Sequence, residues 1–318
     1  SFGFCKAHAA AFALPTYQSA WLKTHHPAPF FAGLLTHDPG MYPRRLILDE
    51  ARQMKVPILN IDVNKSSAQY LVEDGGIRIA LSDLDGISAG EVESIVAAAP
   101  YLDLVDFVRR SGASYPTTEK LIQVGGFDSL HKVNRRELLI YLKDINKSPS
   151  RALPGAQLDL GFAPPELAPI GLPDLKSEEK LKYELKNLGM DVSMHVIKPY
   201  ANFLNKIGAV RSVDLLKQRS GSSVLVAGVK VALQSPPMRS GKRVIFITLD
   251  DGFGCSDSTF FEDTHGEFAT TLFRSKLLLV RGTIRRTGEK GISLNATGAW
   301  DLEVAANEES GARQLLNY

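Results

Sequence analysis

The feature that most constrains the fold is a change of pattern near residue 223. Five runs rich in β-branched, aliphatic and aromatic residues follow, and the helix-like run THGEFATTLFRS separates the third from the fourth. The five are SVLVAGVKVAL, RVIFITLDD, DSTFFED, LLLVRGTIRR and ISLNATGAWDL. Five strands with a helix after the third are typical of an OB barrel, although another small β-barrel would give a similar pattern. We predict a five-stranded OB-fold β-barrel over residues 219–304 and a flexible tail over 305–318.

OB folds bind single-stranded nucleic acid on their second and third strands and with two flanking loops. Here the predicted strands carry phenylalanines and the predicted loops carry cations. The predicted single-strand-binding residues are Phe246 and Phe260 on the strands, and Arg239, Lys242, Arg243, Arg285, Arg286 and Lys290 in or beside the loops. Either phenylalanine can instead belong to the core, because alternation along a strand does not say which face is buried.

A second pattern lies in the run LSDLDGISAGEVESIVAAA, where two helical stretches flank a glycine turn. This arrangement predicts a helix-hairpin-helix, whose turn and following helix N-terminus present N–H groups to a DNA phosphate without reading a base. The run TTEKLIQVGGFDSLHKVNRRELLIYL predicts a second copy. We predict a tandem helix-hairpin-helix DNA-binding region over 76–147, with a purely structural helical domain as the alternative. The predicted DNA-backbone contacts are Gly86, Ile87, Ser88, Gly90, Gly125, Gly126, Arg135 and Arg136.

Residues 148–175 are rich in Pro, Ala and Gly and predict a linker. It contains the run QLDLGF, whose alternating apolar residues suit an extended peptide that docks into a pocket on a partner. The same residues can equally tack the linker onto a neighbouring domain. The candidate docking residues are Gln157, Leu158, Asp159, Leu160 and Phe162.

Composition limits the other function classes. The chain has 318 residues and a formal net charge of +2, so an anionic partner must be met by local patches. No apolar run approaches the ~20 residues of a membrane span, so we expect no membrane partner. Cys5 and Cys255 lie far apart and predict free thiols in the cytoplasm. The Asp250–Asp251 pair is more simply a strand-ending turn than a metal site, and we expect no catalytic residue, metal or cofactor in this chain.

The N-terminal run SFGFCKAHAAAFALPTYQSAWLK resembles a signature of the bacterial DNA polymerase III alpha subunit family, the C-family DNA polymerases. The family pattern is a Gly-aromatic-Gly-Phe-Asn-Lys-Ser-His segment, an Ala-rich helix, a Tyr-Gln pair and a Trp-Leu-Lys. Cys5, Ala7 and Pro15 depart from it, and Pro15 is expected to kink or split the helix over Lys6–Lys23. The runs DVNKS, GIRIALSDLDGIS and EKLIQVGGFDSL continue the resemblance, which extends to about residue 303. The chain also looks like the error-prone branch of this family, and the replicative branch stays open as the alternative.

The resemblance implies that residues 1–75 are the C-terminal part of the polymerase fingers, where Lys6 and His8 contact nucleotide or template. The residues themselves predict a helical connector over 176–218, where Ser177 is expected to cap an amphipathic helix. The resemblance also implies a catalytic palm outside this chain, so the chain alone is expected to be inactive. Mg²⁺ is expected for the full-length polymerase. The implied partners are primer-template DNA, single-stranded template, the sliding clamp at QLDLGF and other polymerase holoenzyme subunits. The expected fold class is therefore multidomain α+β: a helical fingers remnant, tandem helix-hairpin-helix and an OB-fold barrel.

The residues alone leave other classes open. A freestanding nucleic-acid-binding accessory protein would combine the same helix-hairpin-helix and OB modules. An accessory region of a nuclease or ligase is a further alternative, because both classes use such modules, but the N-terminal signature argues against it.

Overall fold

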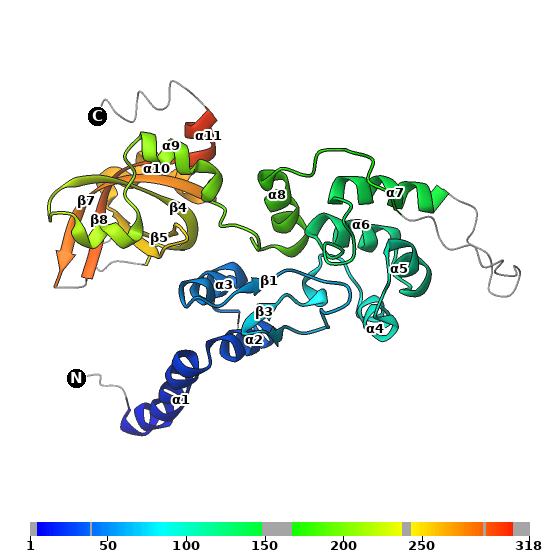
Figure 1. Cartoon of the computed structure of the whole chain (residues 1–318). Helices are drawn as coiled ribbons and strands as arrows, with labels where there is room; N and C mark the ends of the chain where they lie inside the picture. The colour runs from blue at the N-terminus through cyan, green and yellow to red at the C-terminus, as the bar shows by residue number, and fades with distance from the viewer. Residues whose placement is uncertain (1–4, 39, 148–166, 237–242, 289–290, 308–318) are drawn as a thin grey trace, which may run out of the picture. The chain divides into compact units, whose positions relative to one another are not determined.

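The computed structural model describes residues 5–38, 40–147, 167–236, 243–288 and 291–307, and the chain divides into two compact units, Ser1–Ser193 and Met194–Tyr318 (Figure 1). The boundary between the units lies inside the segment 176–218 that the sequence predicted as a connector. Helix α8 (Ser177–Leu188) belongs to the first unit, whereas the short helices η2 (Lys198–Tyr200), α9 (Ala201–Lys206) and η3 (Ser212–Lys217) belong to the second.

The first unit begins with three helices, α1 (Lys6–His25), α2 (Pro27–His37) and α3 (Arg44–Gln53). Pro15 was expected to kink or split the first of these. The split is wrong, because α1 runs from Lys6 to His25 with Pro15 inside it, whereas the kink stays a prediction. Pro15 cannot donate to the carbonyl of Ala11, but Ala11 is exposed and water can hydrate that oxygen. The helix does end before His26, and Pro27 opens α2 at a position where no N–H is needed.

A small sheet follows, in the order β1-β3-β2, from β1 (Ile58–Leu59), β2 (Leu71–Glu73) and β3 (Gly76–Arg78). Strands β2 and β3 form an antiparallel hairpin, and β1 pairs with β3 in parallel. Asp74 and Gly75 make the turn with φ of 50° and 76°, which is the requirement of a type I′ hairpin.

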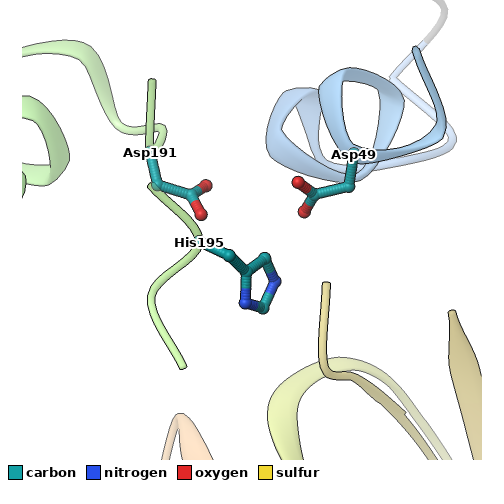
Figure 2. Close-up of side chains that lie close together, drawn as sticks. All are labelled: Asp49, Asp191 and His195. Carbon is teal, nitrogen blue, oxygen red and sulfur yellow. The ribbon is translucent and has the colours of Figure 1, made fainter. Parts of the chain in front are cut away.

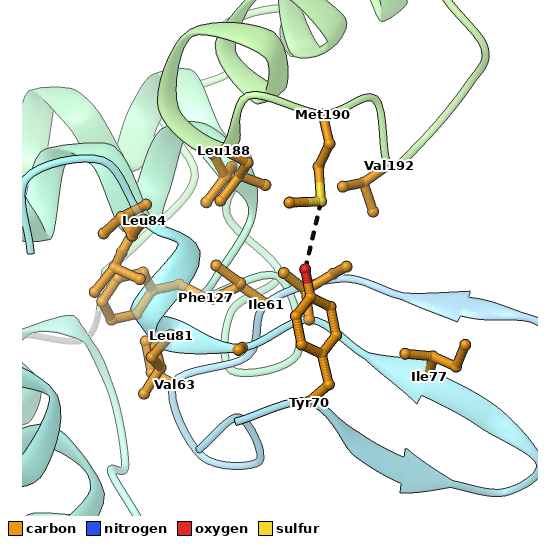
Figure 3. Close-up of a cluster of buried hydrophobic side chains, with 14 of the residues drawn as sticks. Ile61, Val63, Tyr70, Ile77, Leu81, Leu84, Phe127, Leu188, Met190 and Val192 are labelled. Atoms are coloured by element: carbon orange, nitrogen blue, oxygen red, sulfur yellow. Dashed lines mark hydrogen bonds between the residues drawn. The ribbon is translucent and has the colours of Figure 1, made fainter. Parts of the chain in front are cut away.

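The core of the first unit packs these strands against the helices (Figure 3). Ile61 and Val63 follow β1 and are fully buried without being in a strand. Tyr70 is also buried, and its hydroxyl hydrogen-bonds the Asp83 carboxylate and lies 3.8 Å from Met190 Sδ. Burial, followed by the nearby Asp83 charge, raises the pKa of Tyr70, so this phenol remains a neutral donor.

Five more helices complete the first unit: α4 (Ala89–Ala98), α5 (Leu104–Arg110), α6 (Tyr115–Val124), α7 (Arg135–Lys147) and α8. Helix α8 ends at Gly189, which adopts the left-handed conformation with φ 67°. Helix α6 ends similarly at Gly125, with φ 90°. Gly125 N–H donates to Ile122 O, and Gly126 N–H donates to Leu121 O, so the last carbonyls of α6 are satisfied within the unit.

The second unit is built on the predicted barrel. Strands β4 (Ser223–Gln234), β5 (Ile245–Asp250), β6 (Cys255–Phe260), β7 (Leu277–Thr287) and β8 (Gly291–Asp301) close in the order β4-β5-β6-β8-β7. Helix α10 (Glu262–Arg274) lies between the third and fourth strands, β6 and β8 pair in parallel, and α11 (Leu302–Asn307) follows β8. This is the OB-fold arrangement, and the predicted fold class is confirmed.

Side chains that point inward at every second position of a strand fill the interior of the barrel. On β5, Ile245, Ile247 and Leu249 point inward and are almost fully buried. Gly228 on β4 lies so close to β5 that an added Cβ would be 2.7 Å from Asp250 O. The strand therefore needs glycine at this position to let the two backbones approach.

The Gly125 cap provides a test of the first unit. A Cβ at Gly125 would lie 2.2 Å from an Arg135 guanidinium nitrogen, whereas nothing lies within 4 Å of a Cβ at Gly189. Gly189→Ala should cost about 1–2 kcal/mol for its left-handed backbone alone. Gly125→Ala should cost at least about 3 kcal/mol, because the buried guanidinium must also move. Urea unfolding of both variants would measure this, and equal losses would contradict the packing described.

Candidate nucleic-acid interface

The predicted first bend is an exposed turn between the single 3₁₀ turn η1 (Leu81–Asp83) and helix α4. The element before the bend is therefore much shorter than the helix that the sequence predicted. Gly86 has φ 74°, a conformation that strongly favours glycine. Ser88 caps α4: its Oγ accepts from Glu91 N–H at 3.2 Å, and its own N–H donates to Glu91 Oε2 at 3.1 Å. This capping box fixes where the helix begins.

Some of the N–H groups at this bend are already used. Ile87 N–H donates to Leu84 O, and Ser88 N–H is held by Glu91. The N–H groups of Gly86, Ala89 and Gly90 have no acceptor among residues that the structure describes. Gly90 is exposed, and the space where a Cβ would stand is open. The bend thus offers unpaired donors at a helix N-terminus to solvent.

The Glu91 carboxylate holds this bend against helix α6. Besides the Ser88 contacts, its Oε1 accepts from Ser114 N–H at 2.9 Å and from Thr117 Oγ1 at 2.8 Å. Ser114 is itself the N-cap of α6. Partial burial opposes ionisation, but the hydrogen bonds from Ser114, Ser88 and Thr117 prevail and lower the pKa of Glu91 to about 2. One carboxylate therefore joins the starts of two helices.

A cation also lies at the bend, and the sequence analysis did not find it. Lys120 on α6 donates from Nζ to Asp85 O at 2.5 Å and to Asp85 Oδ2 at 2.8 Å. Its Nζ lies 3.3 Å from where a Cβ on Gly86 would stand. The hydrogen bond from Lys120 lowers the pKa of Asp85. No local pattern near Gly86 points to a lysine that follows 34 residues later, because the fold of α6 brings it there.

The predicted second bend differs from the first. Gly125 and Gly126 are buried, and their N–H groups are used in capping α6, so the prediction that they face a DNA phosphate is wrong. Arg135 is also buried, at 7% exposure. Its guanidinium donates to both Asp128 carboxylate oxygens and to Gln123 O, which makes it a structural clamp rather than a surface cation. The glycine pair therefore ends helix α6, and the Arg135 guanidinium packs against Gly125.

Arg136 is partly exposed, and its guanidinium pairs with Glu179 on α8 at 3.0 Å. This ion pair joins the start of α7 to the first turn of α8. Ser177 was expected to cap α8, and this is wrong, because Ser177 is the first residue of the helix and Lys176 is its N-cap. The Lys176 N–H donates to the Glu179 carboxylate. Arg136 keeps a side that faces solvent, and its ability to contact DNA stays a prediction.

In the barrel, the two predicted stacking residues lie on opposite faces. Phe246 on β5 is 40% exposed, whereas Phe260 on β6 is fully buried in the barrel core. The prediction that Phe260 binds single strands is therefore wrong, because its position in β6 has inward parity with Ser256 and Ser258. Thr248 and Asp257 join the exposed face, with Thr248 Oγ1 donating to Asp257 at 2.6 Å.

The cations predicted for the barrel loops differ in exposure and in their contacts. Arg243 and Arg285 are exposed. Arg286 is exposed but donates to the carbonyls of Leu216 and Gln218, so it holds the end of η3. Arg239, Lys242 and Lys290 lie outside the described residues, as do the candidate docking residues Gln157, Leu158, Asp159, Leu160 and Phe162.

Lys6 and His8 lie in the first turn of α1, every residue of which is exposed or nearly so. The His8 ring packs edge-on against Phe12, with centroids 4.6 Å apart. The structure thus leaves Lys6 at the surface, and the contact of these two residues with nucleotide or template stays a prediction.

Several buried carboxylates have structural partners. Asp49 on α3 and Asp191 after α8 are drawn in Figure 2. Arg52 pairs with the Asp49 carboxylate and donates to the main-chain carbonyl oxygen of Asp191 at 2.5 Å. His195, also drawn there, belongs to the second unit, where its Nε2 lies 3.4 Å from Asp250 Oδ2. Asp251 accepts from Ser212, Phe253 and Gly254, as expected for a strand-ending turn. In the described part of the chain, no helix is both long and apolar enough to cross a membrane.

Glu91 generates a prediction about acid stability. Its folded pKa of about 2 lies below the ordinary glutamate value of 4.5, so its stabilisation is complete above pH 4.5 and is lost as the pH falls toward 2. Glu91→Gln should lower the free energy of unfolding by about 1.5–3 kcal/mol at pH 7. The difference from the unsubstituted chain should shrink progressively below pH 4.5. Glu93→Gln, at an exposed position of α4, is the control and should change little; a pH-independent Glu91 effect would contradict the network.

Two protein families match parts of the chain. The helix-hairpin-helix motif family matches residues 55–138, which include the Gly86 bend, α4, α5 and α6. The family described as OB-fold nucleic acid binding domain matches residues 224–307, the barrel. Among solved structures, RecG bound to a three-way DNA junction is similar over 42% of this chain with a TM-score of 0.23, a likeness too low to support a structural comparison.

Relatives cover nearly the whole chain. An error-prone DNA polymerase of Corynebacterium diphtheriae is 33% identical over 99% of this chain and 29% of its own length. One of Symbiobacterium thermophilum is 31% identical over 93% of this chain and 32% of its own length. DNA polymerase III subunit alpha of Pseudomonas aeruginosa is 30% identical over 96% of this chain. The chain therefore spans about three tenths of the length of these relatives.

The resemblance drawn from the N-terminal signature is thereby confirmed: homologues named error-prone DNA polymerase and DNA polymerase III subunit alpha cover most of this chain, and its residues 55–138 and 224–307 match the helix-hairpin-helix motif family and the OB-fold nucleic acid binding domain family.

Proposed function

We propose that the full-length protein is a DNA-directed DNA polymerase of replication or translesion repair, and that this chain holds its primer-template. The observation that carries the proposal is the exposed Gly86 bend. Its outward N–H groups and the adjacent Lys120 amine suit a phosphate oxygen, and neither reads a base. Such a contact holds a duplex in place whatever its sequence, as a polymerase requires.

The electrostatics of the bend support this use. The Glu91 carboxylate is already matched by donors from Ser88, Ser114 and Thr117, so it does not repel an anion strongly. Asp85 is the other nearby acid, and its side chain is 70% exposed. Lys120 can exchange that solvent-exposed partner for a phosphate at little cost, because surface ion pairs are worth only ~0–1 kcal/mol.

In this proposal the barrel supplies a second DNA-binding surface. Phe246 presents an exposed ring on β5, with Thr248 beside it on the same face and Arg243 exposed just before the strand. Arg285 adds a cation near the end of β7. An aromatic surface bordered by cations suits the stacked bases and the backbone of a single-stranded template.

The remaining roles rest on the resemblance that the N-terminal signature and the later sequence runs carry. We propose that Lys6 and His8 contact the incoming nucleotide or the template, and that carboxylates outside this chain hold the Mg²⁺ ions of nucleotidyl transfer. The run QLDLGF is proposed to bind the sliding clamp, and other holoenzyme subunits to join the complex in the cytoplasm. Primer extension by the full-length protein with Mg²⁺ tests the activity; DNA binding without extension would favour an accessory role.

Lys120 provides a test of the duplex grip. Lys120→Gln should weaken binding of primer-template DNA to a similar extent for every sequence. It should also reduce the slope of log affinity against log salt concentration by about 0.9, as expected when one phosphate contact is lost. Fluorescence anisotropy titrations at several salt concentrations would measure both effects.

Lys65→Gln is the matched control, because it removes the same charge from an exposed lysine that pairs with Glu73. It should leave the affinity and the salt slope nearly unchanged. Equal effects of the two substitutions would mean that net charge and not the bend determines binding.

The clamp peptide provides a separate test. Leu160→Ala combined with Phe162→Ala should abolish binding of the sliding clamp, because both apolar side chains would leave their pocket. DNA affinity should stay the same. Pro164→Ala combined with Pro165→Ala is the linker control and should bind the clamp normally. Normal clamp binding by the first double variant, in a pull-down or by surface plasmon resonance, would reduce the run to a linker contact.

A further inference from the structure

A pocket of about 380 Å³ opens in the second unit, and none of the exposed residues Phe246, Thr248 and Asp257 of β5 and β6 lines it. Its apolar lining includes four residues: Ile197 just before η2, Leu204 on α9, and Ala209 and Val210 in the segment after α9. The turn between β5 and β6 forms another wall. The volume lies at the lower end of the ~300–1,000 Å³ typical of small-ligand sites, which suits one nucleotide and not a duplex.

The rim of this pocket carries an aromatic ring and two cations. Phe253 is 49% exposed, and the Arg211 guanidinium lies over its ring at 4.9 Å from the centroid. Lys198 is exposed, and its amine has no ion-pair partner within the described ranges. Asn205 adds an exposed amide, which can both donate to and accept from a base edge.

Asp251 lines this wall and Asp250 precedes it in β5, and neither carboxylate cancels the charge of the cations. Asp251 accepts from Ser212 N–H and Oγ at 2.7 Å and from the N–H groups of Phe253 and Gly254. Asp250 accepts from Gly252 N–H at 2.9 Å and faces His195. His195 is itself oriented, because its Nδ1 accepts from Ile197 N–H at 3.3 Å. Both carboxylates are buried and turned into the fold, whereas Lys198 and Arg211 face solvent.

We propose that this pocket is a further subsite for single-stranded DNA, beyond the barrel face on β5 and β6. One base packs against Phe253, with its edge toward Asn205, and the adjoining phosphate lies between Lys198 and Arg211. Aromatic stacking with neighbouring cations is the usual chemistry of sequence-independent single-strand binding. The proposal rests on the proposed function, because it extends the grip of the OB domain on single-stranded template.

The test uses the whole chain and a fluorescent oligothymidylate of about 16 nucleotides, the upper end of an OB site. Phe253→Ala should lower the affinity about 5- to 150-fold, the loss expected for one stacked base. Phe253→Trp should retain most of the affinity. Lys198→Gln should reduce the salt slope by about 0.7, the value for one phosphate of a single strand. Thermal unfolding would show that each variant is folded.

Two controls remove equivalent groups that do not line the pocket: Phe273→Ala, at a 58% exposed position of α10, and Lys206→Gln, at the exposed end of α9. If Phe253→Ala and Lys198→Gln behave like these controls while the chain still binds the oligonucleotide, the subsite is wrong and the barrel grip stands. If the unsubstituted chain does not bind the oligonucleotide, the proposed function of the barrel fails instead. Displacement by an acidic, leucine-containing peptide but not by thymidine monophosphate would overturn the subsite and assign the pocket to a protein partner.

Discussion

The interaction on which the candidate duplex site depends is the set of hydrogen bonds to the Glu91 carboxylate. One oxygen fixes the start of α4 through Ser88, and the other fixes the start of α6 through Ser114 and Thr117. Because α6 also carries Lys120, this carboxylate sets the cation beside the Gly86 bend. An acid near a turn that is proposed to bind a phosphate would ordinarily be unfavourable. Here the Glu91 charge is stabilised by hydrogen bonds from within the unit, and the unpaired N–H groups of the bend belong to exposed residues.

The two glycine bends show how similar sequences can serve different ends. Both Gly86 and Gly125 adopt left-handed backbone, and both lie next to a helix end. At Gly86 the chain enters a helix, so the unsatisfied groups are donors and they are exposed. At Gly125 the chain leaves a helix, so the groups to be satisfied are carbonyls, and the bend closes on itself beneath Arg135. A phosphate can be recognised by the first arrangement, whereas the second contributes stability.

In the barrel, alternate side chains of each strand point into the core or toward solvent. Phe246 and Phe260 lie in adjacent strands, yet one is exposed and the other is buried. Cross-strand pairing places Phe246 opposite Thr259 and Ile245 opposite Phe260, so Phe260 shares the inward face with the core residue Ile245. The register thus decides which aromatic ring a nucleic acid can reach. The same second unit places Phe253 at a turn, where a ring is free of the inward and outward alternation and can line a pocket.

The sequence by itself determined the order of the parts: the β-rich runs predicted the OB barrel, and the Gly86 turn predicted a helix that begins just after it. These features are local, since turn glycines, caps and strand alternation act through neighbouring backbone groups. Only the tertiary structure decided that Gly125 and Arg135 are buried, that Phe260 belongs to the core, and that Lys120 and Arg211 lie beside a bend and a ring. Burial and long-range contact depend on how distant segments pack, and no spacing along the chain encodes that packing directly.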